Sequence, residues 1–463
     1  MLPLLLLQVA FAAELSGARA ARELQRFVRY FEAVHPEPHR FVTAEQLHAE
    51  LDVQVARLTQ LPTPSPFEVG QAWHRVLARV GDSHVKVGLP LYGSDAPVSL
   101  LPVLPLTLDD TTFVDAASVD LPVGTQVVHI DGRPMDTIRA DLTPLVIAEG
   151  TSPDVRQRTL ASDIARYYHL AYGMADHYTV GLRLPDGRTE DRTLAGVDRA
   201  GMQRLRETRR SAATWGPTTR AGPWPTLTAL DDHRAILRLP TFGVADMEAF
   251  RVRTDEVLAG LSGVNTLYID VRGNVGGLRP NAFAVLDHLL AEPYPQWDGF
   301  DARITRIPRG YRRRVTFPMG GTPADRLPAE PIDGDPLLGW MEPHAAAFAG
   351  NVVVLVDGLT NSAANTFVLA LVRYRPDVVV VGQELGGECG QHVGELPAVY
   401  QPPGGAVAVL HSLIRVDHVD VPGCVHGRGL MPHVPVTYTA ADFLAGHDPW
   451  LAVAPHGDTS ALP

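Results

Sequence analysis

The sequence predicts an α/β protein that is preceded by a helical region and a small β region. In the second half of the chain, runs of valine, leucine and isoleucine alternate with stretches of helical length, which is typical of a sheet covered by helices. At the start of the chain, apolar residues recur every three or four positions instead, as in amphipathic helices. A chain of 463 residues is too long for one small core, so we expect two or three domains.

The start of the chain predicts a helical region within residues 14–90, made of three helices. The second helix follows Thr43, with Gln46 placed three residues later as in a capping box. The third follows Ser65, with Pro66 at the first helical position. The first helix is predicted from an apolar stripe made of Leu24, Phe27, Val28, Phe31 and Val34.

Short strands between proline and glycine residues predict a β domain at residues 91–200. A strand is expected at 125–130, followed by an Asp-Gly turn, and a helix is expected around 154–174. Residues 201–233 are polar and rich in arginine, which predicts a connector.

Residues 234–463 are predicted to form the α/β core. A proline- and glycine-rich insertion is expected at 308–350. Strands are expected at 235–239, 267–271, 352–356, 378–381 and 406–410, and helices at 247–261, 280–290 and 363–374.

The charge balance disfavours nucleic-acid binding. Lysine and arginine number 40 against 52 acidic residues, a formal net charge of −12, which repels phosphate backbones. The concentrated basic run Arg312-Arg313-Arg314 is predicted to be a solvated loop. Lys86 is the only lysine of the chain, and arginine is a poor general base, so few residues could act as a catalytic base.

The first 13 residues predict export. They are apolar, and the small residues Ala10 and Ala12 suit signal cleavage, although the positive charge that usually opens a signal is missing. The alternative is a frayed or buried N-terminal helix. No other stretch is long and apolar enough to span a bilayer, so we expect a soluble exported protein. Cys389 and Cys424 fit an oxidising compartment if they pair, and two buried thiols are equally compatible with the sequence.

Three segments could carry chemistry, and each also has an ordinary structural explanation. The strand 267–271 runs into glycines, Gly276 and Gly277 among them, whose uncovered N–H groups could face an oxyanion, or simply form a turn. Ser362 lies where a buried strand meets a helix, a place favoured for a nucleophile but also for a helix N-cap. His84 follows a helix and would need an acceptor on its second ring nitrogen to act as a base.

Together these segments resemble the serine peptidase family that includes the tail-specific (C-terminal processing) proteases, the tricorn core and the interphotoreceptor retinoid-binding protein. The stretch at 121–132 also resembles a degenerate PDZ-type element. Three ordered motifs carry the resemblance: Asp82-Ser83-His84-Val85, Asp270-Val271-Arg272-Gly273-Asn274-Val275-Gly276-Gly277 and Thr360-Asn361-Ser362-Ala363-Ala364-Asn365.

The resemblance implies a crotonase/ClpP-like ββα superhelix core, a helical cap and a PDZ-like β domain. It implies Ser362 as nucleophile and oxyanion donors at the backbone N–H groups of Ala363 and of Gly276 or Gly277. The tail-specific branch uses a lysine base, and residues 382–392 contain none.

The base therefore fits the tricorn-like branch, in which a histidine follows a serine. This implies His84 as base and Ser83 as the residue that helps to orient it, with Lys86 as a rival base two residues on. The acid of this branch is not found at its usual place. It stays open among four residues, Asp417, Asp420, Glu388 and His426, and Asn365 replaces the usual acid after the nucleophile.

We therefore expect an exported serine peptidase that acts on peptides or proteins, without a metal, cofactor, nucleic-acid partner or stable membrane span. The oligomeric state is left open. The alternatives are a catalytically silent protein that binds a hydrophobic ligand or peptide on the same fold, and an acyl hydrolase that acts on substrates other than peptides.

Overall fold

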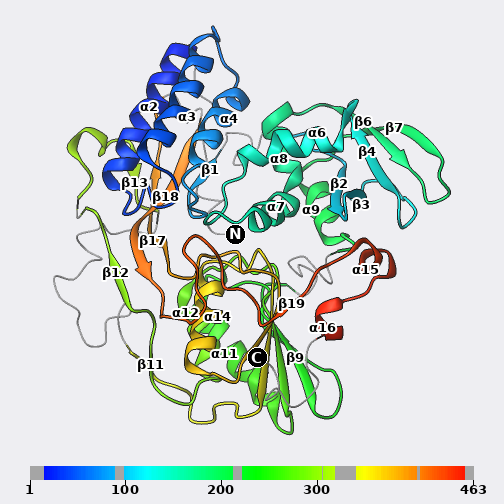
Figure 1. The fold of residues 1–463 in the computed structure, drawn as a ribbon, viewed down its shortest axis with the longest axis vertical. Helices are drawn as coiled ribbons and strands as arrows, with labels where there is room; N and C mark the ends of the chain where they lie inside the picture. Colours follow the sequence, from blue (N-terminus) through cyan, green and yellow to red (C-terminus); the bar gives the residue numbers. More distant parts are fainter. Residues whose placement is uncertain are drawn as a thin grey trace.

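A computed structural model describes residues 15–88, 98–211, 222–304, 306–318, 340–403 and 407–453 (Figure 1). The predicted signal segment at residues 1–13 lies outside this part. In Figure 1 the N-terminal helices lie beside a β region, and both lie on one side of the α/β core. This arrangement confirms the α/β class, and the predicted domain boundaries stay predictions.

The three predicted N-terminal helices are confirmed. They are α2 (Gly17–Val34), α3 (Ala44–Thr59) and α4 (Pro66–Leu77). Thr43 and Ser65 both close capping boxes at the starts of α3 and α4. Such caps satisfy N–H groups that the first helical turn leaves without partners, and they define where each helix begins.

The middle region is a twisted antiparallel sheet with helices on it. Its strand order is β2-β3-β4-β6-β7, with β5 paired to β4. The single helix expected around 154–174 is instead two helices, because the chain leaves helical geometry at Asp163, whose φ is −141°. The elements are β2 (Val103–Leu108), β3 (Thr111–Ala117), β4 (Gln126–Ile130), β5 (Arg133–Pro134), α6 (Met135–Leu142), α7 (Pro153–Ser162), α8 (Ile164–Tyr172), β6 (His177–Arg183) and β7 (Thr189–Ala195).

The connector expected at 201–233 is more structured than its polar composition indicated. Helix α9 (Arg199–Glu207) begins after Asp198, whose carboxylate accepts the N–H of Gly201 as an N-cap. The edge strand β8 (Thr226–Ala229) pairs with the first strand of the core. Residues 212–221 lie outside the described part.

The core is a six-stranded sheet in the order β19-β16-β15-β10-β9-β8, parallel except for the β8 edge. Buried valines and leucines fill its strands, as expected when helices cover a parallel sheet. The predicted strands and helices of this sheet are confirmed within a few residues. They are β9 (Arg234–Arg238), α11 (Met247–Leu258), β10 (Thr266–Asp270), α12 (Arg279–Leu286), β15 (Asn351–Val356), α14 (Ala363–Tyr374) and β16 (Val379–Gly382). The short edge strand β19 (Val434–Pro435) was not predicted.

A long hairpin connects the core to the N-terminal helices. Its strands are β17 (Gln391–Tyr400) and β18 (Ala408–Asp417), and only part of β18 was predicted. The short strand β1 (Lys86–Gly88) pairs antiparallel with β18. Figure 1 shows the hairpin running from the core up to α2. This pairing joins the segment after α4 to the far end of the chain.

The expected insertion at 308–350 contributes small strands to the described part. Within it, β13 (Val315–Thr316) adds to the hairpin sheet and β14 (Trp340–Met341) pairs with β11 (Tyr294–Pro295). Strand β12 (Gly299–Asp301), which like β11 precedes the insertion, also adds to the hairpin sheet. Residues 319–339 lie outside the described part.

One hydrophobic cluster contains residues of the N-terminal helices, the middle region and the hairpin. The core sheet has a second cluster. The last helices, α15 (Ala440–Ala445) and α16 (Pro449–Val453), cover a third around the fully buried Trp450. Cys389 and Cys424 form a disulfide, which decides between the two alternatives for them. None of the helices in the described ranges is long and apolar enough to cross a membrane.

Candidate active site

Ser362 lies at the point where the loop after β15 enters α14. Its φ is 53° and its ψ is −126°, a conformation that is costly for a residue with a Cβ. The hydroxyl makes no N-cap hydrogen bond to the helix, so the ordinary structural explanation does not apply. Backbone strain that the surrounding structure maintains is typical of functional sites.

The loop before Ser362 is held by a buried carboxylate. Asp357 accepts the N–H groups of Gly273 and Leu359, at 2.9 and 3.0 Å. Its second oxygen accepts two N–H groups of Arg158, a residue of α7. Since Asp357 and Arg158 are both buried, the loop before Ser362 is fixed to the middle region by a strong charge-assisted contact.

The structure brings His84 to Ser362, although 278 positions separate them. The Nε2 atom of His84 lies 3.0 Å from the Oγ of Ser362, which is hydrogen-bonding distance. Asn361 connects the neighbouring residues, since its amide donates to the hydroxyl of Ser83 at 2.9 Å and its carbonyl accepts the N–H of Ser362 at 2.6 Å. An imidazole and a hydroxyl from two distant parts of the sequence therefore face each other.

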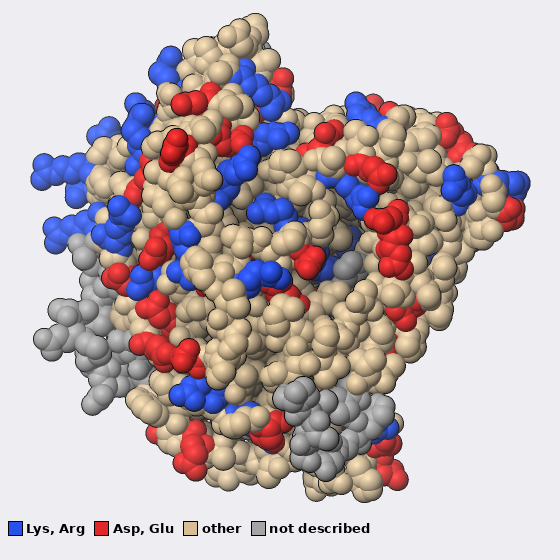
Figure 2. Space-filling view, viewed as in Figure 1, with Lys and Arg blue, Asp and Glu red and all other residues tan. Residues whose placement is uncertain are grey.

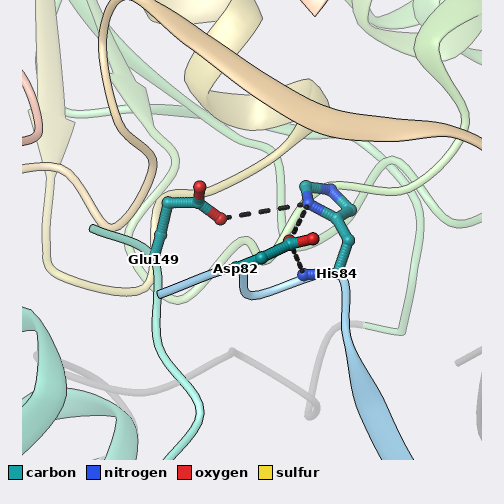
Figure 3. Close-up of side chains that lie close together, drawn as sticks. All are labelled: Asp82, His84 and Glu149. Atoms are coloured by element: carbon teal, nitrogen blue, oxygen red, sulfur yellow. Dashed lines mark hydrogen bonds and ion pairs between the residues drawn. The ribbon is translucent and has the colours of Figure 1, made fainter. Parts of the chain in front are cut away.

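Two buried carboxylates face the other nitrogen of the same ring (Figure 3). The Nδ1 atom of His84 lies 3.5 Å from an oxygen of Asp82 and 3.9 Å from an oxygen of Glu149. The same oxygen of Asp82 accepts the backbone N–H of His84 at 2.7 Å, which fixes the start of the side chain. Glu149 accepts the N–H and the hydroxyl of Ser83, at 3.0 and 2.5 Å. Ser83 therefore connects Glu149 to the loop of Ser362.

The carboxylates decide the protonation behaviour of the ring. Burial alone would lower the pKa of His84, but the attraction of Asp82 and Glu149 outweighs burial and raises it. Burial also acts against the charge of Asp82, yet His35 and His84 hold the pKa of that carboxyl well below its usual range. Burial and the charge of Asp82 raise the pKa of Glu149 to about 7. Near neutral pH, Asp82 is thus the permanent negative charge beside the ring.

Asp82 is held from its far side by a second histidine. The Nε2 atom of His35 lies 2.9 Å from the second oxygen of Asp82, and both side chains are buried. His35 follows the last turn of α2. The N-terminal helix therefore helps to position Asp82, which in turn positions the ring of His84.

Three glycines bring Glu149 to this place. The N–H of Gly150 donates to the carbonyl of Gly81 at 2.8 Å. A Cβ on Gly150 would lie 2.3 Å from the carbonyl oxygen of Gly427, so only glycine fits between these backbones. The close approach of the three backbones places Glu149 directly beside the turn that carries Ser83 and His84.

A third histidine forms one wall of the site. The rings of His84 and His392 stack with centroids 5.1 Å apart and an angle of 19° between their planes. The strand β17 has an irregularity after His392, and a Cβ on Gly394 would lie 2.8 Å from the Nε2 atom of His84. Burial and the neighbouring His418 keep the pKa of His392 well below the ordinary value, so this wall stays neutral.

The glycine-rich end of β10 lies directly against Ser362. A Cβ on Gly276 would lie 2.7 Å from the Cβ of Ser362 and 2.8 Å from the nitrogen of Ala363. The N–H of Gly276 already donates to the side chain of Asn274 at 2.9 Å. The N–H groups of Gly277 and Ala363 make no hydrogen bond to a described residue. The structure thus brings this strand end to the hydroxyl, and leaves two of the three expected amides available.

Comparison with known proteins identifies the core. Residues 233–434 match the sequence profile of peptidase family S41. This part of the chain is a peptidase family S41 domain. The protein is therefore a serine-type peptidase. A search of the curated protein sequences found no match.

Solved structures share the fold of the S41 domain and of the regions before it. Mature CPAF has 16% identity and a TM-score of 0.64, and the match covers 94% of this chain and 95% of that chain. CPAF complexed with lactacystin has 14% identity and a TM-score of 0.62, with 94% and 96% covered. The tricorn protease, at 14% identity, 94% and 36% coverage and a TM-score of 0.38, is too distant to argue from.

None of the four residues that the sequence left open as the acid faces His84 in the described part of the structure. Glu388 accepts the N–H groups of two residues after it and of Gly427, and pairs with Arg40. Asp417 pairs with Arg415. Asp420 is exposed, and its N–H bonds to Asp298. The ring of His426 packs against that of Phe41 at a tilt.

The sequence did not predict a place in the site for Glu149, Asp82, His35 or His392. Glu149 has no motif around it, and the glycine that follows it is the single local sign of a tight approach. Asp82 stands in a motif segment, but no role was assigned to it. The two histidines lie on elements whose packing no spacing rule predicts.

The same cluster is also the set of described residues that could hold a metal ion. The Nδ1 atom of His84 and one oxygen each of Asp82 and Glu149 lie within 4.8 Å of one another. We interpret the cluster as acid–base machinery, since both carboxylates already accept hydrogen bonds from Ser83, His84 and His35.

Proposed function

We propose that the protein is an exported serine peptidase in which His84 is the base and Ser362 the nucleophile. The observation that carries this proposal is the distance of 3.0 Å between the Nε2 atom of His84 and the Oγ atom of Ser362, at a strained helix start. A nucleophile and a base within hydrogen-bond reach, with an acid behind the base, are the elements of hydrolysis through an acyl-enzyme.

In the first step, the Oγ atom of Ser362 attacks the peptide carbonyl carbon while Nε2 of His84 takes the hydroxyl proton. The imidazolium then lies beside Asp82 and Glu149, which stabilise its charge. The protonated ring returns the proton to the leaving amine, and a water molecule releases the acyl group by the same route in reverse.

Ser83 and Glu149 complete the support of the base. The hydroxyl of Ser83 donates to Glu149 and accepts from Asn361, so this serine fixes the distance between the base loop and the nucleophile loop. We assign to Glu149 the role of the acid whose identity the sequence left open.

The oxyanion of the intermediate is assigned to backbone N–H groups beside Ser362. Ala363 opens α14, where N–H groups have no partner within the helix. Gly277 supplies the second free amide, and Gly276 lets the strand end approach the hydroxyl because it has no side chain. Losing one such donor costs roughly 100- to 1,000-fold in rate.

A fluorophosphonate probe tests this proposal. We expect the wild-type protein to be labelled at one site, and the Ser362→Ala and His84→Ala variants to lose labelling while keeping the melting temperature of the wild type. Absence of labelling in folded wild type would contradict the proposal and support a silent binding protein. Labelling with ester turnover but no cleavage of any peptide library would instead support an acyl hydrolase.

Export is proposed on two grounds. The apolar residues 1–13 end in small residues that suit cleavage, and Cys389 and Cys424 form a disulfide, a bond that persists in oxidising compartments. Intact-mass analysis of the protein after expression from its own start tests this. The mass is expected to lack the apolar segment and, for the disulfide, two hydrogen atoms, and retention of both the segment and free thiols would overturn it.

A further inference from the structure

Helix α2 carries a stripe of arginines on its outer face. Arg19, Arg22, Arg26 and Arg29 are all exposed, and their spacing places them within about 80° around the helix axis, along about 15 Å of its length. The opposite face of α2 is buried, with Phe27 among the residues of the core. The stripe is therefore displayed on a rigid, well-packed element.

A second set of arginines lies in the segment that leads to β13. Residues 302–318 contain no acidic residue. The first five of their arginines are exposed, and Arg314 is half-buried. The set consists of Arg303, Arg306, Arg309, Arg312, Arg313 and Arg314.

The two sets form one surface, which we call the arginine face. The rings of Tyr30 and Tyr311 lie 5.0 Å apart, so α2 and the segment before β13 are in contact. Glu23 lies between the sets, 3.3 Å from Arg26 and 3.8 Å from Arg314. In Figure 2 blue side chains gather along the left edge, over α2 and the segment that Figure 1 draws beside it.

Little on the described surface neutralises this face. Within it, only Arg26 and Arg314 form ion pairs with described acidic residues, and both share Glu23. The ten arginines are a quarter of the 40 basic residues of a chain whose net charge is −12. The molecule therefore has a strong charge asymmetry, with a positive face on an anionic protein.

We propose that the arginine face binds an anionic lipid surface. Clusters of basic residues on one surface attract acidic lipid head groups by charge. The apolar residues 1–13, which we propose are removed, end just before α2 begins. Removal of that segment would add a positive α-amino group at the same end. A polynucleotide is disfavoured because it extends past the face and meets the anionic remainder of the chain.

The strength of membrane binding depends on the number of arginines that reach the lipid surface. Each contributes about fivefold to membrane partitioning when it lies near an acidic surface. Binding is expected to weaken as salt is raised, because the screening length falls from about 8 Å at physiological ionic strength to about 3 Å at 1 M salt.

Vesicle co-sedimentation with the purified protein, its N-terminus defined by intact mass, tests the proposal. Vesicles of phosphatidylcholine alone are compared with vesicles of equal amounts of phosphatidylcholine and phosphatidylglycerol. We expect binding to the acidic vesicles only. The triple variant Arg19→Gln, Arg22→Gln, Arg29→Gln is expected to lose about 10²-fold in partitioning, with unchanged peptidase activity and melting temperature.

A matched triple variant controls for net charge. Arg188, Arg251 and Arg253 are also exposed but lie outside the arginine face. The control variant Arg188→Gln, Arg251→Gln, Arg253→Gln should bind vesicles as the wild type does. Equal loss in both variants would overturn the proposal. Equal binding to neutral vesicles would overturn it too, and so would binding to heparin beads without binding to acidic vesicles.

Discussion

The two halves of the candidate site are built in different ways. The proposed nucleophile is positioned locally, because Ser362 lies in a strained turn between a buried strand and α14, and nearby Asp357 holds its loop. The proposed base is positioned by contacts that are distant in sequence. His84 depends on Glu149, on His35 through Asp82, and on the stacked ring of His392.

This difference indicates where each half is vulnerable. Changes beside Ser362 act on the geometry of one turn. Changes around His84 act on the charge and orientation of a ring that three regions of the chain hold together. The predictions below separate the two effects, from the largest to the smallest.

Removal of either reacting group should cause the largest loss of activity. We expect Ser362→Ala and His84→Ala each to lower kcat by on the order of 10⁶-fold, and the double variant to lose little more, because the two groups act as one unit. Steady-state kinetics on a peptide substrate measures this. Additive losses in the double variant would mean that the two residues do not share a step.

Asp82→Asn should lower activity by on the order of 10³-fold, since the imidazolium loses its permanent counter-charge. The pH profile should shift as well. The base must be neutral, so activity rises as pH passes the raised pKa of His84. Without the carboxylate, burial lowers that pKa, and the acid limb of kcat/KM should move to lower pH. A limb that stays in place or moves to higher pH would contradict the role of Asp82.

Glu149→Gln should cost less, about 10- to 100-fold in kcat/KM, because glutamine keeps an acceptor for Ser83 and Asp82 remains charged. Its second effect is on stability. The pKa of Glu149 is raised from 4.5 to about 7, so the folded protein holds a proton that the unfolded chain releases. Between these pH values, the wild type should lose on the order of 3 kcal/mol of unfolding free energy as pH rises.

Denaturant unfolding at several pH values checks this second effect. The Gln variant should lack that decrease in stability, so its free energy relative to the wild type should improve from pH 4.5 to pH 7. Parallel curves for the two proteins would show that Glu149 does not titrate in this window.

Lys86→Met should change kcat by less than about threefold, the smallest effect of the series. Burial and the nearby Arg166 lower the pKa of Lys86 to about 8, as a rival base would require. The hydroxyl of Ser362 nevertheless bonds to His84. A loss comparable with that of His84→Ala would transfer the role of base to Lys86.

The sequence predicted what short-range physics determines. The capping residues Thr43 and Ser65 marked helix starts, and the apolar run before Ser362 marked the strand and helix that hold it. The pairing of His84 with Ser362 came from a family resemblance, because no spacing rule joins residues that far apart. The hydrogen-bonding distance in the structure agrees with that pairing.

The parts that were missed depend on long-range packing. The strand β17 contains Gly394 and Pro397, which interrupt any regular strand pattern. The acid was sought near the end of the chain, whereas Glu149 comes from the middle region through contacts between glycine backbones. Such contacts leave little trace in composition or periodicity.

The pairing of β1 with β18 has a consequence for the protein during its synthesis and folding. The ribosome makes the histidine early and the serine late, and the strand that anchors the histidine later still. A chain that is still being synthesised therefore holds His84 and Ser362 apart from each other. If the proposed roles of these two residues hold, peptidase activity requires the β17–β18 hairpin to form first.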